Sequence, residues 1–117
     1  MSSINNFTAT ARIGKMELVP VNDTNKLKLS LAIDDSYKNS EGNYVDRTVW
    51  IDGEVWGNYG KALSDKLKVG NEVAFVGSLK SDSWEDDNGN QRKNYFLRIQ
   101  SIYKTQGEAS NKPKSDN

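Results

Sequence analysis

Residues 45–56 read VDRTVWIDGEVW, a stretch in which apolar and polar residues alternate. Side chains of a β-strand point to opposite faces in turn, so the apolar set is predicted to face a core. That set is Val45, Val49, Ile51 and Val55. The opposite face carries Trp50 and Trp56, which a strand would hold about 20 Å apart. The stretch therefore predicts a strand that presents two indoles on its outer face.

Indole rings on an outer face indicate a binding surface, because a large flat apolar ring is costly to hydrate. Rings this far apart suit a run of stacked bases, which a single small molecule would rarely match. The third tryptophan, Trp84, lies at the mouth of a predicted hairpin whose loop contains the turn-forming pair Asn88-Gly89. All three tryptophans are therefore candidates for ligand contact.

Composition narrows the class of protein. The chain has 117 residues, enough for one domain, and its 16 basic and 16 acidic residues cancel, which argues against a strongly basic surface. It contains no Cys and no His, so disulfides, thiolate metal sites and His-based catalysis are excluded. The first residues form no signal peptide, and no run of about 20 apolar residues is present. These features predict a cytoplasmic protein that does not enter the membrane.

Acidic residues form no recognisable site. The loop 85–87 lacks the spaced ligands of a calcium loop, and Asp34-Asp35 and Asp52 lack the partners that a catalytic carboxylate pair needs. We therefore predict that the protein is not an enzyme and has no catalytic residues, no metal and no cofactor.

Strand patterns flank the central stretch on both sides. Inward positions are predicted at Leu27, Leu29, Leu31 and Ile33, at Val73, Phe75 and Leu79, and at Tyr95, Leu97 and Ile99. The predicted strands are 7–13 with a weak continuation to residue 21, 26–34, 45–56, one through 73–79, and 93–103. Residues 39–43 are predicted to form a hairpin loop.

One segment changes period. Tyr59, Leu63 and Leu67 are spaced by four residues, which predicts a helix over 58–68 with Tyr59 on its packing face. Gly70 is predicted to end this helix at the C′ position.

Three strands, a helix and two strands form the order of an OB-fold, a five-stranded Greek-key barrel that binds oligonucleotides or oligosaccharides. The predicted fold class is thus all-β with one helix. Residues 1–104 are predicted to form this domain. Residues 105–117, rich in Gly, Ser, Asn and Lys, are predicted to be a disordered tail.

The chain resembles the bacterial-type single-stranded DNA-binding proteins. The resemblance rests on spaced segments that run from about residue 4 to residue 103. They are LSLAI at 29–33, TVWID at 48–52, VWG at 55–57, KVGNEV at 68–73, VGSLK at 76–80 and NGNQR at 88–92. The resemblance implies an OB-fold that assembles as a homotetramer, with a dimer as the fallback, and binds single-stranded DNA. It also implies stacking rings at Tyr37, Trp50, Trp56 and Trp84, although strand parity alone places Tyr37 inward.

Basic residues near these rings are candidates for phosphate contact. They are Lys15, Lys38, Lys80, Arg92 and Lys93. Two acidic residues depart from the family pattern: Asp82 precedes Trp84, and Glu54 lies between two predicted stacking rings. Both are expected to repel phosphate. The tail lacks the acidic, Phe-ended tip of the family, so recruitment of proteins through it is not expected.

The predicted function is protection of single-stranded DNA in replication, recombination or repair, with little sequence preference. Two other classes fit the fold. The first is a protein–protein module of the primosome-accessory type, which predicts few exposed aromatic rings, whereas this chain has several. The second is a carbohydrate binder, because Trp platforms also suit sugar rings. The sequence leaves RNA open as the nucleic acid.

Overall fold

A closed five-stranded barrel forms the body of the protein in the computed structural model, which describes residues 3–105. The barrel strands are β1 (Phe7–Val21), β2 (Thr24–Asp34), β5 (Thr48–Trp56), β6 (Glu72–Glu85) and β7 (Gln91–Lys104), in the order β1-β2-β5-β7-β6. β5 runs parallel to β7, and the other barrel pairs are antiparallel. The predicted OB-fold class is confirmed. The predicted tail lies almost wholly outside the described residues.

The barrel encloses one core of aliphatic side chains with Phe75. Leu27, Leu29 and Leu31 are buried as predicted, and so are Val73, Leu97 and Ile99. β1 continues through residue 21 with a bulge between Ile13 and Lys15. Pairing of β1 passes from β6 to β2 at Arg12.

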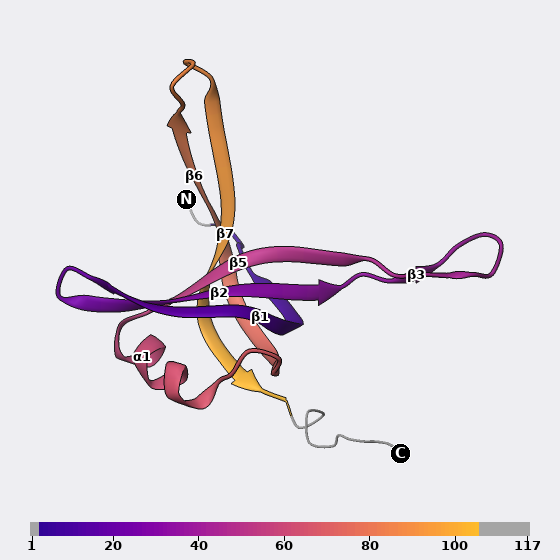
Figure 1. The fold of residues 1–117 in the computed structure, drawn as a ribbon, viewed down its shortest axis with the longest axis horizontal. Helices are drawn as coiled ribbons and strands as arrows, with labels where there is room; N and C mark the ends of the chain where they lie inside the picture. The colour runs from indigo at the N-terminus through magenta and orange to yellow at the C-terminus, as the bar shows by residue number, and fades with distance from the viewer. Residues whose placement is uncertain (1–2, 106–117) are drawn as a thin grey trace.

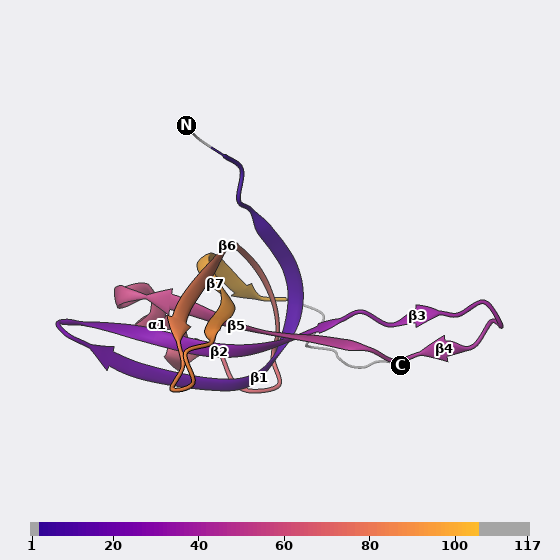
Figure 2. The same ribbon diagram turned by 90° about the horizontal axis from the view of Figure 1, so that it is seen from above.

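Three two-stranded ribbons extend beyond the barrel. They are the far ends of β1–β2, the far ends of β6–β7, and the short pair β3 (Tyr37–Lys38) and β4 (Tyr44–Val45). The β3–β4 ribbon projects away from the β1–β2 hairpin, and the β6–β7 ribbon projects in a third direction (Figures 1 and 2). The loop 39–43 closes the β3–β4 ribbon, as predicted, with the Asn39 side chain accepting hydrogen bonds from two backbone amides.

The ribbons explain why several predicted core positions are wrong. Val49, Leu79 and Tyr95 are 44%, 40% and 54% exposed, because each lies where its strand has left the barrel. Val45 belongs to the separate β3–β4 ribbon, so the strand predicted over 45–56 begins at Thr48. Tyr37 also lies on this ribbon, where no core exists for it to face.

Helix α1 (Gly57–Lys66) covers one end of the barrel (Figure 1). Its residues Leu63 and Leu67 enter the core, as their spacing predicts. Tyr59 is 42% exposed, yet its hydroxyl donates to the Ile102 carbonyl at 3.0 Å and accepts from the Ile102 amide at 2.8 Å. The Tyr59 side chain therefore connects α1 to β7.

Gly70 does not hold the predicted C′ position. The helix ends earlier, at the C-cap Leu67, whose backbone is extended. Gly70 instead has a positive φ of 98° in the turn before β6, and its amide donates to the Ile13 carbonyl. The glycine is needed there because other residues rarely adopt this φ.

Candidate nucleic-acid interface

The aromatic residues predicted from sequence differ in how much ring they present. Trp50, Trp84 and Tyr37 are 60%, 50% and 43% exposed. Trp56 is half-buried. The first three lie on parts of strands beyond the closed barrel. Trp56 is the last residue of β5, directly before α1, and it pairs with Lys26 of β2.

The Trp50 ring rests on the backbone of β1. A Cβ atom added to Gly14 would lie 2.6 Å from Cζ3 of Trp50, so the absence of a side chain there lets the ring approach. Gly14 sits at the β1 bulge, where pairing with β2 shifts by one residue. One side of the indole is thus supported by backbone, while most of the residue stays exposed. This arrangement suits stacking of a base on the free side.

Tyr37 is supported by a cation. The guanidinium of Arg47 lies 4.8 Å from the centre of the Tyr37 ring, and it is held there by an ion pair to Asp35 at 2.9 Å. Just before this ribbon, hydrogen bonds from the Ser36 hydroxyl and then its amide lower the pKa of Asp34. Local polar contacts, rather than a core, position this ring.

Trp84 lies opposite Arg92 near the turn of the β6–β7 ribbon. Asp86 organises that turn by accepting from the amides of Asn88 and Asn90 and from Arg92 Nε at 2.8 Å. The Asn90 hydrogen bond, followed by that of Arg92, lowers the pKa of Asp86. The Arg92 charge is therefore already paired within the ribbon.

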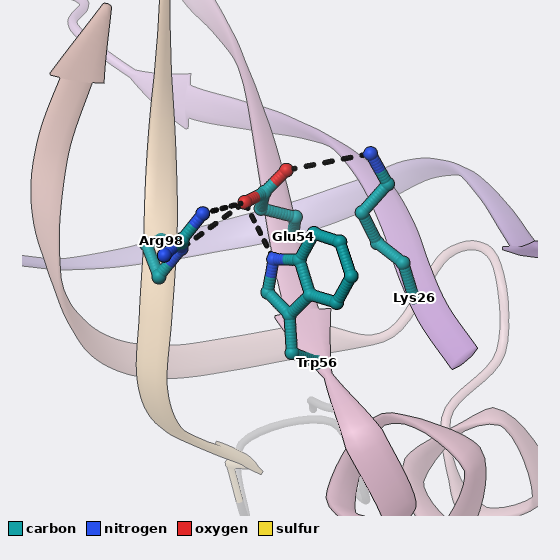
Figure 3. Close-up of polar contacts among 4 residues, drawn as sticks. All are labelled: Lys26, Glu54, Trp56 and Arg98. Carbon is teal, nitrogen blue, oxygen red and sulfur yellow. Dashed lines mark hydrogen bonds and ion pairs between the residues drawn. The ribbon is translucent and has the colours of Figure 1, made fainter. Parts of the chain in front are cut away.

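Trp56 belongs to a polar cluster centred on Glu54 (Figure 3). Its indole Nε1–H donates to Oε2 of Glu54 at 2.7 Å. Arg98 Nη2 reaches the same oxygen at 3.0 Å, and Lys26 Nζ lies 3.6 Å from Oε1. Strand register explains the contacts, since Lys26 pairs with Trp56 across β2–β5 and Arg98 pairs with Glu54 across β5–β7.

Glu54, the second residue predicted to repel phosphate, has its negative charge paired within the protein. Its residue exposure is only 8%, and it is bonded to two cations and an indole N–H. The sequence pattern places Glu54 on the outer face, as observed, but side chains from both neighbouring strands cover it. A carboxylate with two adjacent cations presents little negative field to a ligand.

A groove of about 500 Å³ opens beside this cluster, between the β1–β2 ribbon and the β6–β7 ribbon. Its lining combines charged side chains of both signs with one aromatic side chain, Phe96. The charged residues of the lining are Lys15, Glu17, Lys26, Lys28, Asp52, Glu54 and Asp82. Of the predicted phosphate contacts, Lys15 alone lines this groove. Asp82 lines the groove too, and it belongs to the same β6–β7 ribbon as Trp84.

The other predicted cations are distributed over two ribbons. Arg92 and Lys93 line a second hollow on the β6–β7 ribbon, and Lys80 pairs with Phe96 nearer the barrel. Lys38 lies next to Tyr37 on the β3–β4 ribbon, which points away from the others (Figure 1). The structure thus gathers Trp84, Arg92 and Lys93 on one ribbon and separates Tyr37 and Lys38 from them.

Several surface residues were not among the sequence candidates. Lys26 and Lys28 alternate with the buried leucines of β2, so strand parity was a sufficient signal for both. Tyr44 is 70% exposed opposite Lys38, but its place in a two-residue strand carries no pattern. Arg98 was missed because only the β5–β7 pairing brings it to Glu54.

Within residues 3–105, no group of three or more acidic side chains is arranged to hold a metal ion. Helix α1, the one helix in that range, is too short and too polar to cross a membrane.

Sequence comparison supports the relationship that the fold suggests. The sequence model of the Single-strand binding protein family matches residues 4–105. This chain belongs to that family. It is 36% identical over 73 residues to "Single-stranded DNA-binding protein 1" of Chlorobaculum tepidum, covering 62% of this chain and 44% of the relative. A protein of the same name from Xylella fastidiosa is 29% identical over 93 residues, covering 79% and 65%.

Solved structures share the fold of this family member. A Plasmodium falciparum SSB complex with ssDNA superposes with a TM-score of 0.78 at 19% identity, covering 90% of this chain and 97% of that one. The small single-stranded DNA-binding protein from Streptomyces coelicolor gives 0.74 at 17% identity, covering 92% and 99%. The chain spans less than half the length of the first curated relatives, such as 44% and 29% of two of them.

Proposed function

We propose that this protein binds single-stranded DNA with little sequence preference and protects it during replication, recombination or repair in the cytoplasm. The observation that carries the proposal is the exposure of two indoles. Trp50 is 60% exposed on β5, and Trp84 is 50% exposed on β6. Each base has a π-face, so stacking on such rings tolerates any sequence. Membership of the single-strand binding family supports the same function.

In this proposal, bases stack on the exposed rings of Trp50, Trp84 and Tyr37. A further base stacks on the exposed part of the Trp56 ring. Lys15, Lys38, Lys80, Arg92 and Lys93 contact phosphates. Arg92 is a weaker contact than the others, because binding a phosphate competes with its ion pair to Asp86.

The proposed assembly is a homo-oligomer, a tetramer or otherwise a dimer. Among the described residues, positions 7–11 of β1 pair with β6 alone and positions 15–21 with β2 alone, so the other edge of each segment is available to a second copy. Light scattering at micromolar concentration tests this, and a monomer would contradict it.

Titration of intrinsic fluorescence tests the binding function. Oligo-dT should quench most of the emission, because the three tryptophans of the chain are all proposed contacts. Replacing Trp50 with Ala should weaken binding by about 1–3 kcal/mol while the domain stays folded. Oligo-U and a neutral glycan serve as parallel ligands. Quenching by the glycan, or none by either nucleic acid, would reject the proposal, and tighter binding of oligo-U would redirect it to RNA.

A further inference from the structure

The Glu54 cluster contains more positive charge than negative, and its cations are reachable from solvent. The Glu54 side chain is 11% exposed, whereas those of Lys26 and Arg98 are 26% and 49% exposed. One buried carboxylate thus lies beneath two partly exposed cations. The exposed side of the cluster carries the positive charge.

Arg98 keeps hydrogen-bonding capacity for a second anion. Its Nε and Nη2 both donate to Oε2 of Glu54, at 3.2 and 3.0 Å. A guanidinium has five N–H donors, so within the described part of the chain three are left. Guanidinium groups bind phosphate oxygens with the same geometry that they use for carboxylates.

The indole of Trp56 is held next to both cations. Lys26 Nζ lies 5.2 Å and Arg98 Cζ 5.7 Å from the ring centre. In the view of Figure 3, Arg98 lies to the left of the indole and Lys26 to its right. Because the Nε1–H is bonded to Glu54, the indole cannot rotate without losing that hydrogen bond. A base stacked on Trp56 would bring its own phosphates close to these cations.

We propose that Lys26, Arg98 and Trp56 form one nucleotide-binding unit, in which Arg98 and Lys26 bind the backbone phosphate beside a base stacked on Trp56. Glu54 is the positioning residue of this unit, because it orders both cations and the indole before the strand arrives. Ordering long side chains in advance removes part of the entropy cost of binding. The inference rests on the proposed function and adds phosphate contacts to it.

Salt dependence of oligo-dT affinity tests the role of Arg98. Arg98→Gln should weaken binding about twofold to fivefold and lower the slope of log affinity against log salt by about 0.7, the value for one lost phosphate contact on a single strand. Lys61→Gln, which removes an exposed cation from α1, is the matched control and should change neither quantity. A slope for Arg98→Gln equal to that of the control would overturn the proposal.

Glu54→Gln tests the positioning role. Both cations remain, so the salt slope should stay at the wild-type value, while affinity falls about twofold to fivefold because the cations and indole are less ordered. Tighter binding by this variant would show that the carboxylate only repels phosphate, and would overturn the positioning role. An unchanged affinity would overturn it as well.

Two controls separate the possible failures. If the wild-type protein does not bind oligo-dT, the proposed function fails; if it binds and Arg98→Gln behaves as the control does, this inference alone fails. Where Arg98→Gln does not fold, Glu54→Gln/Arg98→Gln removes the buried carboxylate together with its bidentate cation, and the one charge left in the cluster is that of the partly exposed Lys26. The slope of that double variant should also be lower by about 0.7, and a wild-type slope in it would reject the phosphate contact.

Discussion

Trp50 and Trp56 lie six residues apart on the same face of β5, yet they occupy different environments. Trp56 lies on the barrel, where neighbouring strands supply Glu54, Lys26 and Arg98 to hold it. Trp50 lies on the extension of β5, supported by the bare backbone of Gly14 and 60% exposed. Strand parity determines the face of a side chain, and the neighbouring strands determine how much of it is available. The extensions therefore present the open rings, whereas the barrel constrains its ring.

The largest expected difference between the two rings is in stability. Trp56→Ala should lower the free energy of unfolding by about 2–4 kcal/mol, because it removes packing and leaves the buried Glu54 without one hydrogen bond. Trp50→Ala should cost less than about 1 kcal/mol, as for an exposed surface residue. Urea denaturation of both variants measures the contrast. Equal costs would mean that the barrel and the extension hold their rings equally.

The support of Trp50 by Gly14 predicts a coupled effect on binding. Gly14→Ala places a methyl group where the indole lies, so we expect the ring to shift and oligo-dT affinity to fall by about 0.5–1.5 kcal/mol. In a Trp50→Ala background the same change should have no further effect. A double-mutant cycle gives this coupling. Additive losses would show that Gly14 acts independently of the ring.

A substitution at Asp82 tests whether the β6–β7 extension borders the single-stranded DNA that Trp84 is proposed to bind. Asp82→Arg should tighten oligo-dT binding and steepen the salt slope by about 0.7, through one added phosphate contact. Glu54→Arg is not an equivalent change, because Glu54 is buried under its partners. Weaker binding by Asp82→Arg, measured by fluorescence titration across a salt series, would place the ribbon away from the DNA.

The smallest expected effect concerns the turn that closes the same extension. The pKa of Asp86 is lowered in the folded state, so its contribution to stability is present above the ordinary value of 3.8 and is lost as the pH falls through the folded value. Asp86→Asn should therefore lower the Tm at about pH 7, and this deficit should shrink as the pH is lowered below 3.8. Asp87→Asn in the same turn is the control. A deficit that persists in acid would assign the effect to packing.

The alternation of side chains along the strands and their spacing along the helix were sufficient to predict much of the fold. The alternation in 26–33 identified the buried leucines of β2, the four-residue spacing identified Leu63 and Leu67, and the order of elements identified the barrel. The same alternation placed Trp50 and Trp56 on the outer face. These features depend on short-range geometry, because a strand or helix repeats its orientation within a few residues.

Only the tertiary structure decided which outer residues are open and which are covered. Val49, Leu79 and Tyr95 have core-like positions in the sequence but lie where their strands leave the barrel. Glu54 has a surface position but is buried by Lys26 and Arg98, which are 28 and 44 residues away in the chain. Local periodicity contains no information about where a strand leaves its neighbours, or about which distant side chains its register brings alongside. That information comes from the closure of the barrel, through the pairing of β5 with β2 and β7.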